Sequence, residues 1–311
     1  MKSYSRVYAA VMDRPWALLP SKLAAIVEVL DLRMAGLELS AEEISARIGN
    51  PRRAEQSAQG SVAVLPVYGV MSQRMNMLQA TSGGASTEML GRQFSDLVRD
   101  PQVGAIILDI DSPGGDVFGT AELGDAIYAA RGSKPIVAVA NSLAASAAYW
   151  IASQADEIVV TPSGQVGSIG VYTAHRDVSA ALEQEGEKVT LISAGKYKVE
   201  GNPYAALTDE ARAAIQDRID GYYAMFTGAV ARGRGVDVAD VRGGFGEGRT
   251  VGAREAVRLG MADRVGTLQQ TIDRYVGQSS GTRSGSRSEA PNPDLVSGLD
   301  FRKRRLRMLG R

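Results

Sequence analysis

A serine and a lysine are the residues of this chain whose types and spacing could do chemistry together. Ser146 lies in the alanine-rich stretch Ala144-Ala-Ser-Ala-Ala148, and Lys198 precedes Val199-Glu-Gly-Asn-Pro203. The chain has no Cys and a single His, so thiol nucleophiles are excluded and little material is left for histidine chemistry. A serine hydroxyl needs a base to take its proton, and a lysine can act as that base when desolvation lowers its pKa. The pair suggests a serine hydrolase with a Ser-Lys dyad.

A glycine turn upstream strengthens this interpretation. Serine between alanines is common in buried helices and lysine is usually a solvated surface charge, so either residue alone is more often structural. Residues 106–110, however, read as a buried strand that runs into the turn Asp111-Ser-Pro-Gly-Gly115. Paired glycines allow positive φ and close backbone approach, so the turn could aim N–H groups at the oxyanion of an acyl transfer. The alternative is a Pro-Gly turn that only closes a strand.

Together these segments resemble the signal peptide peptidase A family of serine peptidases, family S49, whose fold is that of the ClpP and crotonase enzymes. The resemblance covers roughly residues 60–267. It rests on four ordered motifs: Ile110-Asp-Ser-Pro-Gly-Gly115, Ala144-Ala-Ser-Ala-Ala148, Gly164-Gln-Val-Gly-Ser-Ile-Gly-Val171 and Ala194-Gly-Lys-Tyr-Lys-Val-Glu-Gly-Asn-Pro203.

The resemblance implies a role for each matched residue. Ser146 is the expected nucleophile and Lys198 the expected general base. The backbone N–H groups of Gly115 and Ala147 form the expected oxyanion hole, where the N-terminus of a helix starting after the serine would add positive partial charge. The remaining turn residues are expected to contact the substrate: Ser112, Pro113 and Gly114.

Three nearby polar residues leave alternatives open. Lys196 lies two positions before Lys198, and residues two apart on a strand share a side, so either amine could reach the serine. Lys198 is favoured because its neighbours match the family pattern, and Lys196 is then a solvated charge at the mouth of the site. Ser168 could be a third polar group near the dyad, although a turn serine is the more common role. His175 is expected to be structural.

Strands and helices alternate from residue 61 onward, which predicts the α/β class. Repeated βαβ units imply a parallel sheet with chemistry at the strand ends. With the resemblance, this gives a peptidase domain of ClpP/crotonase-like fold over residues 60–276. The predicted strands are 62–68, 105–110, 135–140, 157–161 and 188–193, and the predicted helices are 87–99, 121–131, 147–153 and 208–234.

The two ends of the chain differ from this domain. Residues 1–58 are expected to be a helical extension and linker, in which Ser40 and Glu43 form a capping box and residues 50–60 are the polar linker. The apolar stripe of the extension is expected to pack on the catalytic domain, with contact to another subunit or capsid component as the alternative. Residues 277–311 have the composition of a flexible, disordered tail with a basic tip.

Composition excludes several classes of function. Lys+Arg and Asp+Glu both count 35, so no global attraction to nucleic acid or anionic membrane is expected. No segment is apolar over the roughly 20 residues that a bilayer span needs, so no membrane span is expected. No phosphate-binding glycine loop or metal-ligand cluster is recognisable, and neither a cofactor nor a metal is expected.

The N-terminally extended layout without a predicted anchor resembles the bacteriophage and prophage branch of the family. The segments that carry this resemblance are Arg14-Pro-Trp-Ala-Leu-Leu-Pro20 and Ala174-His-Arg-Asp-Val-Ser-Ala-Ala-Leu182. That branch implies a homo-oligomeric endopeptidase that processes scaffold or capsid proteins during head maturation, in the cytoplasm of a bacterial host or within the procapsid. Three alternatives remain. The first is a bacterial cytoplasmic peptidase that degrades peptide remnants and would use the same dyad. The second is a crotonase-type acyl-CoA enzyme, in which the lysine motif would have no role. The third is an inactive structural capsid protein, which the intact motifs disfavour.

Overall fold

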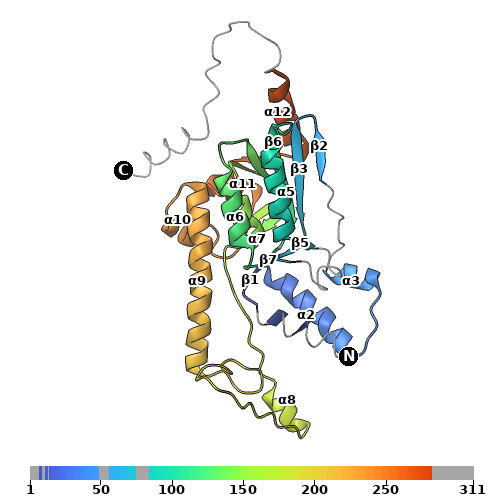
Figure 1. Ribbon diagram of the computed structural model, residues 1–311, viewed down its shortest axis with the longest axis vertical. Coiled ribbons are helices and arrows are strands. Elements are labelled where there is room, and N and C mark those ends of the chain that lie inside the picture. The colour runs from blue at the N-terminus through green and yellow to red at the C-terminus, as the bar shows by residue number, and fades with distance from the viewer. Residues whose placement is uncertain (1–6, 9–10, 13, 49–55, 75–83, 282–311) are drawn as a thin grey trace.

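The computed structural model describes residues 7–8, 11–12, 14–48, 56–74 and 84–281. Its centre is an eight-stranded sheet in the order β11-β10-β8-β6-β3-β2, with β9 paired to β8 and to β12 (Figure 1). The central pairs are parallel, whereas β2 and β11 join their neighbours antiparallel. The strands are β2 (Ser57–Gln59), β3 (Val62–Tyr68), β6 (Ala105–Ser112), β8 (Ile136–Ala145), β9 (Glu157–Val160), β10 (Gln165–Gly167), β11 (Thr250–Gly252) and β12 (Arg264–Val265).

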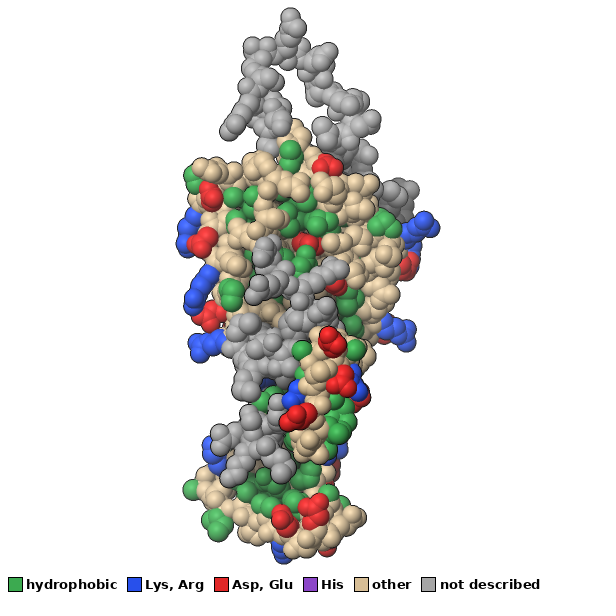
Figure 2. Space-filling view, turned by 90° about the vertical axis from the view of Figure 1, so that its right-hand side faces the viewer, with side chains coloured by type: hydrophobic (Ala, Val, Ile, Leu, Met, Phe, Trp, Pro, Cys, Tyr) green, Lys and Arg blue, Asp and Glu red, His purple; other side chains and the backbone are tan. Residues whose placement is uncertain are grey.

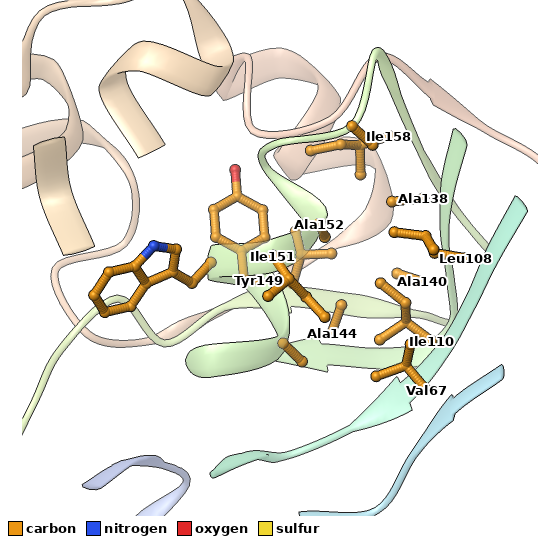
Figure 3. Packing of buried hydrophobic residues seen from close by; sticks show 14 of the residues in the cluster. Val67, Leu108, Ile110, Ala138, Ala140, Ala144, Tyr149, Ile151, Ala152 and Ile158 are labelled. Atoms are coloured by element: carbon orange, nitrogen blue, oxygen red, sulfur yellow. The ribbon is translucent and has the colours of Figure 1, made fainter. Parts of the chain in front are cut away.

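Both faces of this sheet are buried, which explains why its strands read as continuous apolar runs. Along β6, Ile106, Leu108 and Ile110 join the main core, while Ala105 and Ile107 join a second cluster on the other face. The main core contains residues of α5 (Thr87–Arg99), α6 (Thr120–Ala129), α7 (Ala147–Ala152) and α9 (Asp209–Arg234), and also of the two short helices named below. Figure 3 shows residues of α7 packed against those of the central strands. The second cluster is covered by α12 (Leu268–Gly281), and two short helices, α10 (Val238–Gly244) and α11 (Ala253–Leu259), complete the fold.

The predicted α/β class with a parallel sheet is confirmed. The helix predicted over 87–99 and the strand predicted over 62–68 have those bounds, and the other predicted helices and three strands agree to within a few residues. The strand predicted over 188–193 is wrong for this chain, because these residues form no strand and are exposed. Within the described part of the chain, no strand pairs with these β-rich residues.

A second, four-stranded sheet stands at the carboxyl ends of the central strands, in the order β1-β7-β4-β5. Its strands are β1 (Trp16–Leu18), β4 (Val70–Ser72), β5 (Gly84–Ser86) and β7 (Gly114–Asp116). β4 follows β3 and β7 follows β6 after a single residue, so the small sheet continues two central strands. The small sheet therefore lies next to the strand ends at which the active site is expected.

The N-terminal extension forms helices α2 (Pro20–Met34) and α3 (Ala41–Ile48), as predicted. The capping box is confirmed: the Ser40 N–H donates to Glu43 Oε2 at 2.8 Å, and the Glu43 N–H donates to Ser40 Oγ at 3.2 Å. The extension packs in one cluster with Val70 of β4 and half-buried Tyr172, which agrees with the predicted packing on the catalytic domain. The cluster also contains Val11, Trp16, Leu18, Leu23, Ile26, Val29, Leu30, Ile44 and Ile48.

The predicted boundaries need two corrections. Residues 57–59, assigned to the polar linker, form edge strand β2, whose three residues are all exposed and therefore lack an apolar pattern. Helix α12 continues through residue 281, beyond the expected end at 276. The basic tip of the predicted tail lies outside the described residues.

Residues 179–208, called the arm below, stand at the end of α9 that points away from the sheet (Figure 1). The arm begins with α8 (Ser179–Gln184) and continues without regular structure. Figure 2 shows apolar side chains gathered at this lower end of the molecule. The exposed apolar residues of the arm are Val189, Leu191, Ile192, Tyr197 and Tyr204, and Ile192 is 96% exposed. Among the described residues, no helix has both the length and the apolar character to cross a membrane.

Candidate active site

Ser146 sits on a strained turn between a strand and a helix. It follows β8 directly and is the N-cap residue of α7, with φ 54° and ψ −119°. A non-glycine residue rarely adopts such a backbone, and it persists only where its surroundings hold it. Ser146 is held by its own N–H, which donates to the carbonyl of Gly167 at 2.7 Å. Strained strand-to-helix turns of this kind present nucleophilic serines in other hydrolases.

Helix α7 starts at the residue after the serine and is buried throughout. The first N–H groups of a helix have no partner within the helix, so the N–H of Ala147 is available at this end. Tyr149 anchors the helix, because its hydroxyl donates to the carbonyl of Met261 at 2.8 Å (Figure 3). Trp150 stacks on Phe226 of α9 with ring centroids 4.6 Å apart. The serine is thus carried by a rigid element of the core.

The glycine turn lies directly against the serine. Gly114 has φ 101°, and a Cβ built on it would lie 2.9 Å from Ser146 Cβ and 3.0 Å from the carbonyl oxygen of Ala145. A Cβ on Gly115 would lie 2.0 Å from the carbonyl oxygen of Met71. Both glycines are therefore required by close backbone contact, as the paired glycines predicted.

Ser112 holds this turn from within. Its hydroxyl donates to the carbonyl of Gly69 at 2.6 Å and accepts from the N–H of Gly114 at 3.2 Å, and the residue is fully buried. The hydroxyl therefore shapes the turn, and a direct contact with substrate stays a prediction. Pro113 presents its carbonyl oxygen to the N–H of Leu19 at 3.0 Å, so this turn does bind an extended backbone.

Ser168 lies next to the nucleophile candidate through its backbone. It follows the Gly167 carbonyl that accepts from Ser146, it has φ 54°, and its own N–H donates to the carbonyl of Arg249 at 2.8 Å. β10 is parallel to β8, with Gly167 opposite Ala145. The turn role of Ser168 is therefore evident, and no contact of its hydroxyl with the dyad is implied.

Lys198 is far from Ser146 within one chain. It is an exposed residue of the arm, and among the hydrogen bonds and ion pairs of the described residues none joins the two side chains. Its neighbour Lys196 forms an ion pair with Glu210 in the first turn of α9. At a rise of 1.5 Å per residue, Glu210 and Phe226 are about 24 Å apart along the helix axis. Since Phe226 stacks on Trp150, close to the serine, the serine lies beside the C-terminal half of α9, whereas the two lysines lie near its N-terminus.

Lys196 has the surroundings of a surface charge. Its side chain is 69% exposed, and its amine donates to the hydroxyl of Tyr197 at 2.6 Å and to Glu210 Oε1 at 3.2 Å. The bond to Tyr197, followed by the bond to Glu210, raises the pKa of Lys196. A base requires the opposite shift, so this environment agrees with the solvated role predicted for Lys196. His175 Nε2 lies 3.1 Å from the carbonyl oxygen of Asn202, to which its N–H donates, and this agrees with a structural role.

Sequence reasoning missed strand β1. β1 is antiparallel to β7 and places Ala17 opposite Gly115. Arg14, just before it, pairs with the fully buried Asp116 of β7, and burial raises the pKa of that carboxyl. The one available signal was a short apolar run bounded by prolines at 15 and 20. Nothing local indicated which strand it joins.

Comparison with known proteins places this geometry in a family. Residues 129–279, which contain both Ser146 and Lys198, match the family model for Peptidase family S49. Over these residues the chain belongs to peptidase family S49. The glycine turn at 112–115 precedes the matched S49 region, so its role rests on the geometry described above.

Three relatives illustrate the similarity. "Capsid assembly protease C" of Escherichia phage lambda is 36% identical over 239 residues, 75% of this chain and 54% of that protein. "Head-tail preconnector protein GP5" of Enterobacteria phage P21 is 32% identical over 263 residues, 85% and 52% of the two chains. "Protease 4" of Salmonella typhi is 31% identical over 176 residues, 56% and 28% of the two chains.

The chain spans about half the length of the two phage proteins that it matches. Among solved structures, an enoyl-CoA hydratase/isomerase family member aligns with a TM-score of 0.43 and 17% identity, over 75% of this chain and 78% of that one.

Proposed function

We propose that the protein is a serine endopeptidase with Ser146 as nucleophile and Lys198 as general base. The observation that carries the proposal is the strained turn at Ser146, which sets the serine at the N-terminus of α7 and against Gly114. Membership of residues 129–279 in peptidase family S49 supports the same chemistry. The backbone N–H groups of Gly115 and Ala147 are assigned to the oxyanion hole.

The reaction needs one group that carries a proton and two hydrogen-bond donors for the oxyanion. The amine of Lys198 takes the proton of Ser146 Oγ as the oxygen attacks the carbonyl carbon of the substrate. The oxyanion is held by the two N–H groups, and loss of one such donor typically costs about 3 kcal/mol in transition-state stabilisation. Lys198 then gives the proton to the leaving amine as the C–N bond breaks. Water attacks the acyl-serine ester, its proton returns through Lys198 to Ser146, and the new carboxylate leaves.

The dyad is completed between subunits in this proposal. Within one chain the arm holds Lys198 far from Ser146, exposes the apolar side chains of Val189, Leu191 and Ile192, and leaves the β-rich residues 188–193 without a partner strand. Docking of the arm on a neighbouring copy would bury these side chains and remove the lysine amine from water, as a lysine base requires. A head-to-tail contact of this kind gives a ring when its rotation closes, and the active form in this proposal is such a homo-oligomer.

The substrates proposed are scaffold or capsid proteins of a phage, processed in the cytoplasm of a bacterial host or inside the procapsid. This part of the proposal is supported by the two phage relatives, whose names refer to capsid assembly and to a head-tail preconnector. Co-expression with the neighbouring capsid genes tests it. Processing that depends on Ser146 is the expected result, and its absence would leave a general peptide-degrading role.

Mixing two inactive variants tests the shared dyad directly. Ser146→Ala and Lys198→Ala are each expected to lack peptidase activity, because each removes one half of every site. In a ring assembled from equal amounts of both, roughly a quarter of the interfaces join an intact serine to an intact lysine. Activity is therefore expected to return on mixing. An active wild type with a silent mixture would place both halves of the dyad in one subunit or assign the base to another residue.

A further inference from the structure

Strand β1 of the N-terminal extension lies between β7 and Tyr172, beside the candidate nucleophile. One edge of β1 pairs with β7, in the register Trp16 with Asp116, Ala17 with Gly115, and Leu18 with Gly114. The other edge meets Tyr172: the Trp16 N–H donates to the Tyr172 carbonyl at 2.8 Å, and the Tyr172 N–H donates to the Trp16 carbonyl at 3.0 Å. β1 is thus an extended segment held between two others.

The register sets one carbonyl of β1 against the proposed oxyanion hole. Bonded pairs alternate along an antiparallel ladder. On one side of Ala17, the Leu19 N–H donates to the carbonyl of Pro113 at 3.0 Å, and on the other side the Val117 N–H donates to the carbonyl of Pro15 at 3.3 Å. The pair midway between these two bonded pairs is Ala17 and Gly115, so its N–H and C=O groups also face each other. The carbonyl of Ala17 therefore faces the N–H of Gly115.

The same carbonyl lies close to the serine. A Cβ built on Gly114 would lie 2.2 Å from the carbonyl oxygen of Ala17 and 2.9 Å from Ser146 Cβ. Both atoms are thus within 3 Å of one point, and the peptide bond between Ala17 and Leu18 is the one presented to the serine. Acyl transfer by a serine requires this arrangement, with the carbonyl oxygen on backbone donors and the hydroxyl oxygen beside the carbonyl carbon.

The side chains of β1 alternate between two apolar clusters. Ala17 is fully buried in the main core, to which Ala144 and Ala147 also belong, while Trp16 and Leu18 are buried in the cluster formed with the N-terminal helices. Period-two alternation of this kind is how extended peptides are recognised by addition to a sheet edge. The position that precedes the presented bond is fully buried and holds a methyl group.

We propose that the groove between β7 and Tyr172 is the peptide-binding site, that it takes an extended peptide as its middle strand, and that β1 is its occupant within this chain. The inference deepens the proposed function and rests on it for the role of Ser146. While β1 is in place, Ser146 is only 1% exposed and the N–H of Gly115 is engaged. A second peptide can bind only after β1 leaves.

β1 competes with other peptides because it is tethered. Pro20 begins α2 immediately after Leu19, and α2 is anchored in the same apolar cluster, so the tether keeps β1 at a high effective concentration. The ion pair between Arg14 and the buried Asp116 fastens the other end. Weakening β1 should therefore strengthen the binding of an added peptide.

Peptide binding by chains that cannot hydrolyse tests this competition. The probe is a fluorescein-labelled peptide Arg-Pro-Phe-Ala-Leu-Leu, which copies residues 14–19 with Phe in place of Trp, and all proteins carry Ser146→Ala. Ala17→Asp places a charge where the side chain is fully buried, so β1 cannot stay. Ala58→Asp is the matched control, since Ala58 is an exposed residue of edge strand β2. Fluorescence anisotropy measures the dissociation constants.

Ala17→Asp is expected to bind the probe at least roughly tenfold more tightly than the parent, while Ala58→Asp binds like the parent. Equal or weaker binding by a chain that still unfolds cooperatively overturns the inference, as does failure of the probe to bind either chain. If Ala17→Asp does not fold, tryptophan emission of the parent decides. Bound probe must shift the emission to the red as Trp16 is exposed, and Trp16→Phe must lack this shift.

These readouts do not depend on hydrolysis. Probe binding with the expected difference, together with an inactive wild type, would leave the inference standing and refute the peptidase. An active wild type, together with equal probe binding by the two variants, would support the peptidase and refute the inference about β1.

Discussion

The N–H of Ser146 donates to the carbonyl of Gly167 at 2.7 Å, across two neighbouring parallel strands. This bond explains why a Gly-Ser-Ile-Gly motif accompanies the serine. Gly167 has φ 112°, and a Cβ there would lie 2.9 Å from the carbonyl oxygen of Arg249. Only glycine lets the backbone curve closely enough to hold the strained turn at Ser146.

Gly167→Ala is expected to lower the free energy of unfolding by about 1–3 kcal/mol, because it combines a strained φ with a backbone clash. Peptidase activity should fall further than stability, since the substitution loosens the turn that aims the serine. Gly170→Ala is the matched control, because Gly170 has nothing within 4 Å of the added Cβ and its φ lies outside the left-handed range. Urea titration and kcat/KM measure the two effects, and equal behaviour of both variants would contradict the role given to Gly167.

Lys198→Ala is expected to reduce kcat by at least about 10³-fold, as loss of a catalytic base does in serine hydrolases. Lys196→Ala should change it less than about fivefold, because an exposed ion pair such as Lys196–Glu210 contributes little. Lys198→Arg should be as inactive as the alanine variant, since a guanidinium keeps its proton. Activity lost in Lys196→Ala and retained in Lys198→Ala would assign the base to the other lysine.

The central fold could be predicted because its signals are local. Strands such as 62–68 and 105–112 are buried on both faces and therefore read as apolar runs, and α5 has apolar residues at helical spacing on a polar background. β2 could not be predicted, because all three of its residues are exposed. Residues 188–193 carry β-forming side chains, but in one chain they have no strand edge to pair with, so composition alone gave the wrong state.

For the candidate site, too, some features are visible in the sequence and others are not. The close backbone packing of the glycine turn could be predicted, because paired glycines are visible in a short motif, and the catalytic role of Ser146 stays a prediction from a similar motif. The contact of Ala17 with Gly115 could not be predicted, because strand pairing between residues so distant along the chain leaves no local signal. The separation of Lys198 from Ser146 within one chain was equally hidden, since the order of motifs along a sequence does not give the distance between them in space.

Ile192→Asp is expected to block assembly without changing the stability of the subunit. Ile192 is 96% exposed on the arm, so the new charge costs nothing in the monomer but would be buried at the proposed contact. Leu37→Asp is the control, because Leu37 is 52% exposed in the N-terminal extension. Sedimentation velocity should show a smaller species for Ile192→Asp alone. Unchanged assembly with full activity would exclude the arm as the contact.

The stability contributed by Asp116 is expected to fall as pH rises. Burial raises the pKa of Asp116 above its ordinary 3.8, although Arg14 and the N–H of Phe118 oppose this shift. Between 3.8 and the raised value, the folded state keeps a proton that the unfolded state has released, so the free energy of unfolding decreases with rising pH. Asp116→Asn cannot titrate and serves as the reference.

Urea titrations of wild type and Asp116→Asn from about pH 4 to pH 7 measure this linkage. The stability of wild type relative to the variant should decline across that range. An increase would mean that the attraction of Arg14 outweighs burial and that the pKa of Asp116 is lowered in the folded protein.

The assembled wild type is expected to cleave its own chain between Ala17 and Leu18. β1 presents this bond to Ser146, with the Ala17 carbonyl facing Gly115, and a lysine from a neighbouring subunit would complete the site. Ser146 Oγ would form an ester with Ala17, the proton would pass to the nitrogen of Leu18, and water would release residues 1–17. Intact-mass measurement after assembly should find a new N-terminus at Leu18 in wild type and none in Ser146→Ala. Ala17→Leu should slow the cut, because the fully buried position of Ala17 has no room for a larger side chain. Cleavage at another bond would show that β1 is held in a register that the serine does not use, and cleavage that persists in Ser146→Ala would show that Ser146 does not make the cut.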